Sequence, residues 1–314
     1  MKPRIALFIG DPAGVGPELV GKLLADPSVF EQADVQLIGH QISVLPPAQV
    51  TEINWPGRHA PAFEQGVASA QNGRFMLDGL RLAALRVLRG EADALCFAPL
   101  NKGALRAGGM CEEDELRWFA NLLSHQGNCG ELNVLDNLWT SRVTSHVALK
   151  EVSELLSPEK VAAAIVMITD ALQASGVAQP RIAVCGLNPH NGDNGNYGDE
   201  ESRIIAPGVA LAAAQGYRAD GPFPADTAFV RAIRQGRQEG QGYDGVVTMY
   251  HDQGQIAMKL MGFERGVTVQ GGLPIPITTP AHGTAYDIVG KGLANVGAMR
   301  NAFALAVKMG RRKK

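Results

Sequence analysis

The chain has 314 residues and nearly balanced charge, with 29 Lys and Arg against 31 Asp and Glu. At roughly 150 residues per domain this length suggests two domains and a sizeable core. Near-neutral charge without a basic tract argues against a nucleic-acid partner, because phosphate binding needs clustered Lys and Arg. No apolar run approaches the ~18 residues of a membrane span. The start shows no signal-peptide pattern, so we expect a cytoplasmic protein with no membrane partner.

Cysteine and glycine usage narrow the class further. The four cysteines form no CxxC pair and no zinc-ribbon spacing, which fits a reduced protein. Glycine accounts for 37 of the 314 residues, well above the usual ~7%. The placement of this glycine is therefore informative.

Apolar runs typical of β-strands alternate with helical patterns along the chain. The expected strands are 4–9, 35–38, 94–98, 143–148, 181–186, 245–249 and 266–269. The expected helices include 76–88, 158–174, 203–214 and 227–235. Continuous apolar strands separated by helices predict a sheet covered on both faces, hence an α/β fold with much parallel pairing. No linker separates two halves, which favours a chain that crosses between domains more than once.

Glycine and polar residues gather where the expected strands end. Residues 10–18, 187–193 and 250–255 each follow an apolar run, and ligands of open α/β sheets bind beyond the carboxyl ends of strands. The first of these loops is rich in glycine but fits neither GxGxxG nor a P-loop. A tight strand-to-helix turn explains it equally well.

Three histidines lie at or just beyond the ends of different expected strands: His146, His190 and His251. Any one of them could be an ordinary hydrogen-bonded histidine. Neutral imidazole is the commonest metal ligand, so three in comparable positions favour a shared metal site. The histidines that we interpret as structural or surface residues are His40, His59 and His125.

Two aspartates and a lysine accompany these histidines. Asp226 is interpreted either as a helix N-cap or as a catalytic group, and Asp252 directly follows His251. Either carboxylate could orient a ligand imidazole or accept a proton beside a metal. Lys259 could anchor an anionic substrate, or could simply be solvated.

The segment 281–295 is the most specific motif. Its glycines permit close approach of a flat ligand, and Asp287 could accept hydrogen bonds from ribose hydroxyls. The sequence His-Gly-Thr-Ala-x-Asp-Ile-x-Gly-Lys-Gly-x-Ala-Asn resembles the adenosine-binding segment of the isopropylmalate/isocitrate dehydrogenase fold. A plain loop is the less favoured interpretation.

Together with five further motifs, this segment resembles the 4-hydroxythreonine-4-phosphate dehydrogenase family nearly end to end. Those motifs are Gly-Asp-Pro-Ala-Gly-Val-Gly-Pro-Glu, Ser-His-Val-Ala-Leu-Lys, Gly-Leu-Asn-Pro-His, Gly-Pro-Phe-Pro-Ala-Asp-Thr and Met-Tyr-His-Asp-Gln-Gly-Gln. The resemblance implies an isopropylmalate dehydrogenase-like α/β fold, with two α/β domains around a central cleft and a homodimer. The implied domains are 1–125 with 276–314 on the cofactor side, and 126–275 for metal, substrate and dimerisation.

The resemblance also implies roles for individual residues. A divalent metal, Zn, Mg, Co or Mn, would be bound by His146, His190 and His251, with one of them donated across a dimer whose active site lies at the interface. Asp226 and Asp252 fall in motifs near the metal, and Lys259 matches a substrate-contacting lysine. The implied cofactor contacts are His282, Gly283, Thr284, Ala285, Asp287 and Asn295.

Several substrate positions depart from the family pattern. Residues 114–117 read Asp-Glu-Leu-Arg where the family usually has Gly-His-Thr-Glu, and a usual Asn and Arg align with Thr268 and Ile277. Losing an Arg and a His weakens a phosphate site, because Arg–phosphate pairing is charge-assisted and bidentate. The substrate contacts that we expect here are Lys102, Glu115 and Thr268.

The activity implied is oxidation of a secondary alcohol of a small anionic β-hydroxy acid by NAD, with decarboxylation. Asp287 favours NAD over NADP, because its charge would repel a 2′-phosphate. An alternative within the family is a terephthalate cis-dihydrodiol dehydrogenase, whose substrate has no phosphate. Alternatives of other classes are a metal-dependent hydrolase and a non-catalytic NAD sensor.

Overall fold

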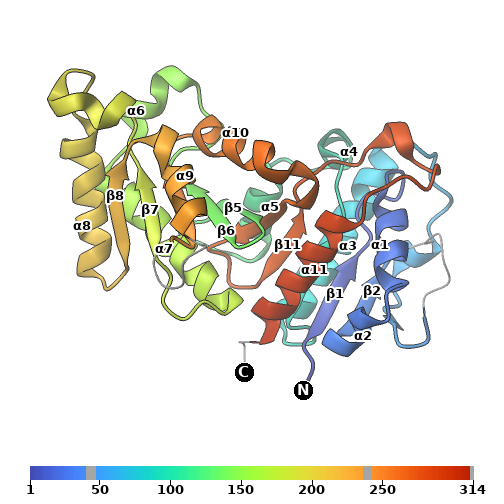
Figure 1. The fold of residues 1–314 in the computed structure, drawn as a ribbon. Helices are drawn as coiled ribbons and strands as arrows, with labels where there is room; N and C mark the ends of the chain where they lie inside the picture. Colours follow the sequence, from blue (N-terminus) through green and yellow to red (C-terminus); the bar gives the residue numbers. More distant parts are fainter. Residues whose placement is uncertain (40–46, 236–241, 312–314) are drawn as a thin grey trace. The chain divides into compact units, whose positions relative to one another are not determined.

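The computed structural model describes residues 1–39, 47–235 and 242–311, so His40 lies outside the described residues (Figure 1). The chain divides into two compact units, residues 1–127 with 264–314, and residues 128–263. The chain returns from the second unit to the first before β10 (Val267–Gly271), earlier in the sequence than the expected residue 276. Within the described ranges, no helix is long and apolar enough to cross a membrane.

The first unit contains a mixed sheet in the order β3-β2-β1-β4-β11-β10. Only β10 and β11 pair antiparallel among the pairings described for these strands. Its strands besides β10 are β1 (Arg4–Phe8), β2 (Asp34–Ile38), β3 (Thr51–Glu52), β4 (Ala94–Phe97) and β11 (Ile277–Pro280). Its α-helices are α1 (Gly16–Leu24), α2 (Ser28–Gln32), α3 (Ala70–Leu88), α4 (Lys102–Ala107), α5 (Glu115–Leu122) and α11 (Gly297–Gly310).

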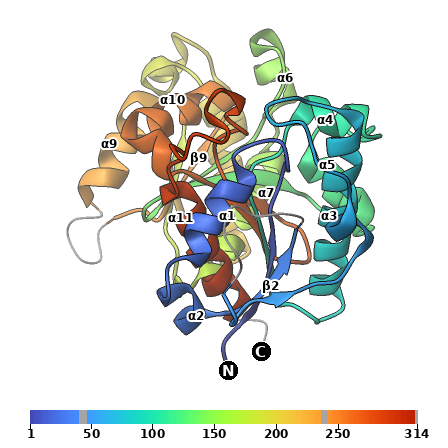
Figure 2. The same ribbon diagram turned by 90° about the vertical axis from the view of Figure 1, so that its right-hand side faces the viewer.

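Helices cover both faces of this sheet, and β1 and β4 are therefore buried over most of their length. Figure 2 shows α3 on the opposite side of the strands from α1 and α11. Helix α3 approaches closely at Gly79, where an added Cβ would lie 2.3 Å from the Phe8 ring. On the other side, Thr278 Oγ1 of β11 donates to the Ala302 carbonyl of α11 at 2.8 Å.

The second unit has the strand order β5-β6-β9-β7-β8, with parallel pairs except for the β5–β6 hairpin. Its strands are β5 (Gly130–Leu135), β6 (Leu138–Arg142), β7 (Ile182–Cys185), β8 (Ala219–Phe223) and β9 (Gly245–Thr248). Its α-helices are α6 (Val152–Leu155), α7 (Pro158–Ser175), α8 (Ala206–Ala214), α9 (Ala225–Gln235) and α10 (His251–Gly262).

A buried apolar cluster joins this sheet to α9 and α10. It includes Ala183 and Cys185 of β7, Phe229 of α9 and Met258 of α10. Helix α7 packs on the sheet from the other side, where Ile168 approaches Gly245 of β9. Alternate residues of each buried strand thus serve opposite faces.

The expected strand 143–148 is wrong. Strand β6 ends at Arg142, and Thr144 then leaves the sheet with its N–H and Oγ1 both donating to the Met249 carbonyl. The strand lies earlier in the sequence than the apolar pattern predicts. The β5–β6 hairpin, which turns at Asp136 with φ 53°, sets the register of β6. The expected helix 203–214 is likewise divided, into a π-helical turn (Glu201–Ile205) followed by α8.

Candidate active site

Two of the three predicted histidines lie side by side in the second unit. The ring centroids of His146, in the loop after β6, and His251, the first residue of α10, are 5.8 Å apart. Both line a cavity of about 360 Å³ together with Tyr250 and Asp252. Because an imidazole nitrogen lies ~2.0–2.1 Å from zinc, two rings on one ion have centroids at most roughly 6.5 Å apart. The spacing therefore suits a shared ion.

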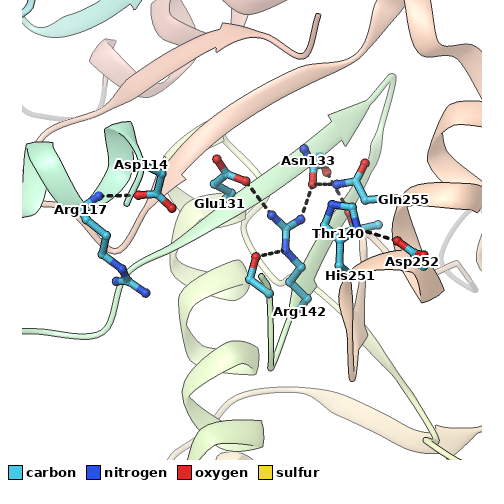
Figure 3. Close-up of polar contacts among 10 residues, drawn as sticks. Asp114, Arg117, Glu131, Asn133, Thr140, Arg142, His251, Asp252 and Gln255 are labelled. Atoms are coloured by element: carbon cyan, nitrogen blue, oxygen red, sulfur yellow. Dashed lines mark hydrogen bonds and ion pairs between the residues drawn. The ribbon is translucent and has the colours of Figure 1, made fainter. Parts of the chain in front are cut away.

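Asp252 fixes the orientation of His251. Its Oδ1 lies 2.8 Å from His251 Nδ1 (Figure 3). With the proton on Nδ1, the carboxylate accepts the Nδ1–H hydrogen bond, and Nε2 keeps its lone pair free for a metal ion. This carboxylate–histidine pair is typical of metal sites.

The turn into α10 is fixed by a side chain to which the sequence analysis assigned no role. Gln253 Oε1 accepts from the Met249 N–H at 2.7 Å, and its Nε2 donates to the Gly186 carbonyl at 2.8 Å. Gln253 thus joins the ends of β9 and β7 and helps to place His251. The sequence feature that could have identified Gln253 is its position in the Tyr-His-Asp-Gln motif.

His190 lies in an unusual left-handed segment. Residues 190–195 all have positive φ, including four that are not glycine, and His190 itself has φ 52°. The buried Glu201 holds the residues just before this segment, since its Oε1 accepts from the N–H groups of Leu187 and Asn188 at 2.8 and 2.7 Å. Such backbone strain clusters at functional sites.

The structure does not bring His190 to the other two histidines. His190 is exposed and does not line the cavity that His146 and His251 share. Among the described residues of one chain, no group of three or more His, Cys, Asp or Glu could hold a metal ion. One chain therefore supplies two adjacent imidazoles of the expected three.

The other predicted groups of the second unit are exposed. Asp226 is the second residue of α9, so it is not the N-cap, and it does not line the cavity. Lys259 lies on α10, about 12 Å along the helix axis from His251 at 1.5 Å per residue. The structure therefore does not bring Asp226 or Lys259 into the cavity that the two histidines line.

In the first unit, the first glycine loop packs onto the predicted cofactor segment. The Val15 N–H donates to the Thr284 carbonyl at 3.0 Å, and a Cβ on Gly14 would lie 2.9 Å from Thr284 Cβ. Glu18 Oε1 accepts from the Ala294 N–H at 2.9 Å. Loop 10–18 is thus both a strand-to-helix turn and the support of segment 282–295.

The predicted cofactor residues present atoms suited to a nucleotide. Nε2 of His282 is buried and has no hydrogen-bond partner within the described residues, while Gly283 and Asp287 are exposed. Thr284 is buried, and Ala285 has φ 44°. Asn295 has a structural role as well, since its Oδ1 accepts from the Gly297 N–H at the start of α11.

A buried polar cluster joins the glycine loop to this segment, and the sequence analysis gave it no role. Tyr286 Oη donates to Asp11 Oδ2 at 2.5 Å, and Asp11 Oδ1 accepts from the Ala13 N–H and Asn72 Nδ2. Burial raises the pKa of Asp11, against the lowering effect of these hydrogen bonds. Burial and the bond to Asp11 also raise the pKa of Tyr286.

The predicted substrate contacts Lys102, Glu115 and Thr268 all lie in the first unit. Lys102 is exposed at the start of α4, and Thr268 is half-buried in β10. Glu115 begins α5, whose N-cap is Asp114: the Asp114 carboxylate accepts from the Arg117 N–H at 2.8 Å (Figure 3). The departure from Gly-His-Thr-Glu therefore provides a helix cap.

Comparisons with known proteins give the class and then the family. The matching proteins are named as dehydrogenases, and this chain is an enzyme of the same class, acting on CH–OH groups. The protein-family model described as "Pyridoxal phosphate biosynthetic protein PdxA" matches residues 21–306. The chain belongs to this family, and the predicted resemblance is confirmed.

The relatives match over almost their whole length. A protein of Pseudomonas aeruginosa, assigned by name as 4-hydroxythreonine-4-phosphate dehydrogenase 2, is 53% identical over 334 residues, covering 99% of this chain and 98% of its own. The D-threonate 4-phosphate dehydrogenase of Salmonella typhimurium is 35% identical, covering 97% and 98%. The crystal structure of 4-hydroxythreonine-4-phosphate dehydrogenase from Klebsiella pneumoniae has a TM-score of 0.83 at 32% identity, covering 99% of both chains. The predicted fold class is confirmed.

Proposed function

We propose that the chain is a divalent-metal-dependent NAD dehydrogenase that oxidises the secondary alcohol of a phosphorylated β-hydroxy acid, with loss of CO2. The observation that carries the proposal is the pair of imidazoles at 5.8 Å, one of them oriented by Asp252. Names of relatives support the substrate class, because 4-hydroxythreonine 4-phosphate and D-threonate 4-phosphate are both phosphorylated hydroxy compounds.

In this proposal His146, His251 and His190 hold the ion, and Asp252 keeps His251 in the ligating tautomer. A divalent cation supplies Lewis-acid stabilisation of negative charge on substrate oxygens. Asp226, Asp252 or a water would accept the hydroxyl proton, and a bound nicotinamide would supply the acceptor for the hydride that leaves the same carbon. The carbonyl product would be a β-keto acid. The bond between its α-carbon and its carboxylate would break to release CO2, and the α-carbon would then take up a proton. Lys259 binds an anionic group of the substrate.

The nicotinamide cofactor would bind along segment 282–295. The unpartnered Nε2 of His282 and the exposed backbone at Gly283 support this role. The exposed Asp287 would accept hydrogen bonds from ribose hydroxyls, and its charge would disfavour a 2′-phosphate, so NAD is the proposed cofactor.

A homodimer would complete the metal site with His190 of the second copy. Exposed apolar side chains in the loop after His146 and along α10 support a covering partner: Val147 and Leu149 are 41% and 70% exposed, and Ile256 and Leu260 of α10 are 60% and 84% exposed. Such exposed apolar groups are typical of interfaces.

A substrate screen tests the proposed reaction. Metal-loaded protein is incubated with NAD or NADP and with 4-hydroxythreonine 4-phosphate, D-threonate 4-phosphate or the cis-dihydrodiol of terephthalate, and formation of NADH or NADPH is followed. We expect turnover of a phosphorylated compound with NAD. Turnover of the dihydrodiol alone would favour the alternative; the structure of such an enzyme from Burkholderia xenovorans, with 24% identity and a TM-score of 0.70, shares the fold alone. NAD binding without any turnover would indicate a sensor, and hydrolysis without NAD would indicate a hydrolase.

A further inference from the structure

Arg142 is a charged residue at the end of β6, and its side chain is only 8% exposed. Three side chains bind its guanidinium group (Figure 3). Nη2 donates to Glu131 Oε2 at 2.6 Å, Nη1 to Asn133 Oδ1 at 2.9 Å, and Nε to Ser145 Oγ at 2.9 Å. Glu131 supplies the opposite charge that a buried guanidinium requires.

This cluster reaches both histidine segments. On one side, Arg142 holds Ser145, the residue directly before His146. On the other side, Asn133 Oδ1 accepts a second hydrogen bond, at 2.5 Å, from Gln255 Nε2. Gln255 lies four residues after His251 on α10, so the two share a helix face. A continuous series of hydrogen bonds therefore joins the His146 loop to the His251 helix.

Backbone pairing and apolar packing also contribute to holding these elements together. Strands β5 and β6 pair as a hairpin, and α10 packs on the sheet through Met258, which belongs to the buried apolar cluster. A buried ion pair is weak evidence for stability, because desolvation offsets the Coulomb attraction. What the cluster adds is a fixed position of one histidine segment relative to the other.

We propose that Glu131, Asn133, Arg142 and Gln255 form a positioning bridge that sets the spacing of His146 and His251 for metal binding. The proposal rests on the metal site of the proposed function. Outer groups that orient metal-ligating residues typically change metal affinity 10–100-fold when lost. None of the four bridge residues is assigned here as a metal ligand.

Gln255 offers the cleanest test, because its substitution leaves Arg142 paired with Glu131 and Ser145. Gln255→Ala removes the donor to Asn133. Gln255→Glu keeps the shape of the side chain, but a carboxylate cannot donate a hydrogen bond to Asn133 Oδ1. To pair with the new carboxylate the Asn133 amide would have to turn its NH2 group toward residue 255, and Arg142 Nη1 would then lose Asn133 Oδ1 as its acceptor. The control is Gln179→Ala in the same unit, which removes one exposed side-chain hydrogen bond, to Arg218.

The full-length proteins are stripped of metal, and Co²⁺ binding is measured by calorimetry, with the cobalt visible spectrum and the melting temperature as further readouts. We expect the Co²⁺ Kd to rise at least tenfold in both Gln255 variants and the cobalt spectrum to change, while Gln179→Ala matches the wild type. Equal Kd values in wild type and Gln255 variants would overturn the bridge alone, as would a fall in melting temperature without weaker cobalt binding. A wild type that binds no Co²⁺ would overturn the metal site itself, and the bridge with it.

Discussion

At the scale of single residues, Asp11 is a fully buried carboxylate in the glycine loop that accepts a hydrogen bond from Tyr286 of the cofactor segment. Burial raises its pKa above the ordinary value of about 3.9. When folding raises the pKa of an acid, the ionised form of that acid destabilises the folded state. This cost is relieved as the pH falls through the raised pKa, because the folded state then takes up a proton before the unfolded state does.

This linkage predicts the pH dependence of Asp11→Asn, which removes the titrating group and keeps the shape. The free energy of unfolding of the wild type, relative to the variant, is constant near neutral pH and increases as the pH falls toward about 3.9. Urea unfolding of both proteins across this range measures the difference. The other titrating groups are common to both proteins, so a difference that stays flat or changes in the opposite direction would contradict the prediction.

The cysteines are predicted to differ in reactivity. Burial raises the pKa of Cys96 and of Cys185 to about 12, so neither forms thiolate near neutral pH, whereas Cys111 is exposed. Treatment of the native protein with iodoacetamide should therefore modify Cys111 and spare the two buried thiols. Mass spectrometry measures the sites, and alkylation in urea is the control in which all four react. Labelling of Cys96 as fast as Cys111 would refute this account.

At the scale of elements, the strands that sequence predicts well are those buried on both faces, such as β1 and β7, because their composition is apolar throughout. β5 is only partly buried, and β6 ends in the polar residues Thr140, Ser141 and Arg142, so neither has the continuous apolar pattern that predicts a strand, and the apolar run after them predicts one instead. The left-handed segment 190–195 also escaped prediction, since several of its residues are not glycine.

That segment permits a paired test of strain. Asn194 is exposed and has φ 55° and ψ 30°, a conformation that a β-branched residue adopts poorly. Asn194→Val should lower the free energy of unfolding by about 1–2 kcal/mol. Asn194→Gly, which tolerates positive φ, should stay within about 0.5 kcal/mol of the wild type. Chemical denaturation measures both, and equal effects of the two substitutions would exclude the left-handed conformation.

At the scale of the whole molecule, the proposed site needs two copies of the chain, with His146 and His251 from one and His190 from the other. His146→Ala and His190→Ala should each be inactive alone. Mixing and reassortment of the two should restore about a quarter of wild-type activity, since half of the dimers then carry one intact site of two. Activity assays after refolding the mixture measure this. Continued inactivity would show that His146 and His190 act within one chain.

Sequence predicted the site only in part, for a physical reason. The histidines could be found from residue type and from their place at strand ends, and His146 and His251 are indeed adjacent. The Arg142 bridge could not be found, because it depends on the β5–β6 hairpin bringing Asn133 beside Arg142 and on a helix that places Gln255 opposite. Contacts of that kind belong to the tertiary structure.

The central claim is that a divalent metal held by histidines is required for oxidation of a phosphorylated β-hydroxy acid by NAD. The direct measurement is NADH formation by purified protein with 4-hydroxythreonine 4-phosphate or D-threonate 4-phosphate, before and after metal removal by a chelator. The account predicts that NADH formation stops in the metal-free protein and returns when Zn²⁺ or Co²⁺ is added back. An unchanged rate after complete metal removal would contradict it.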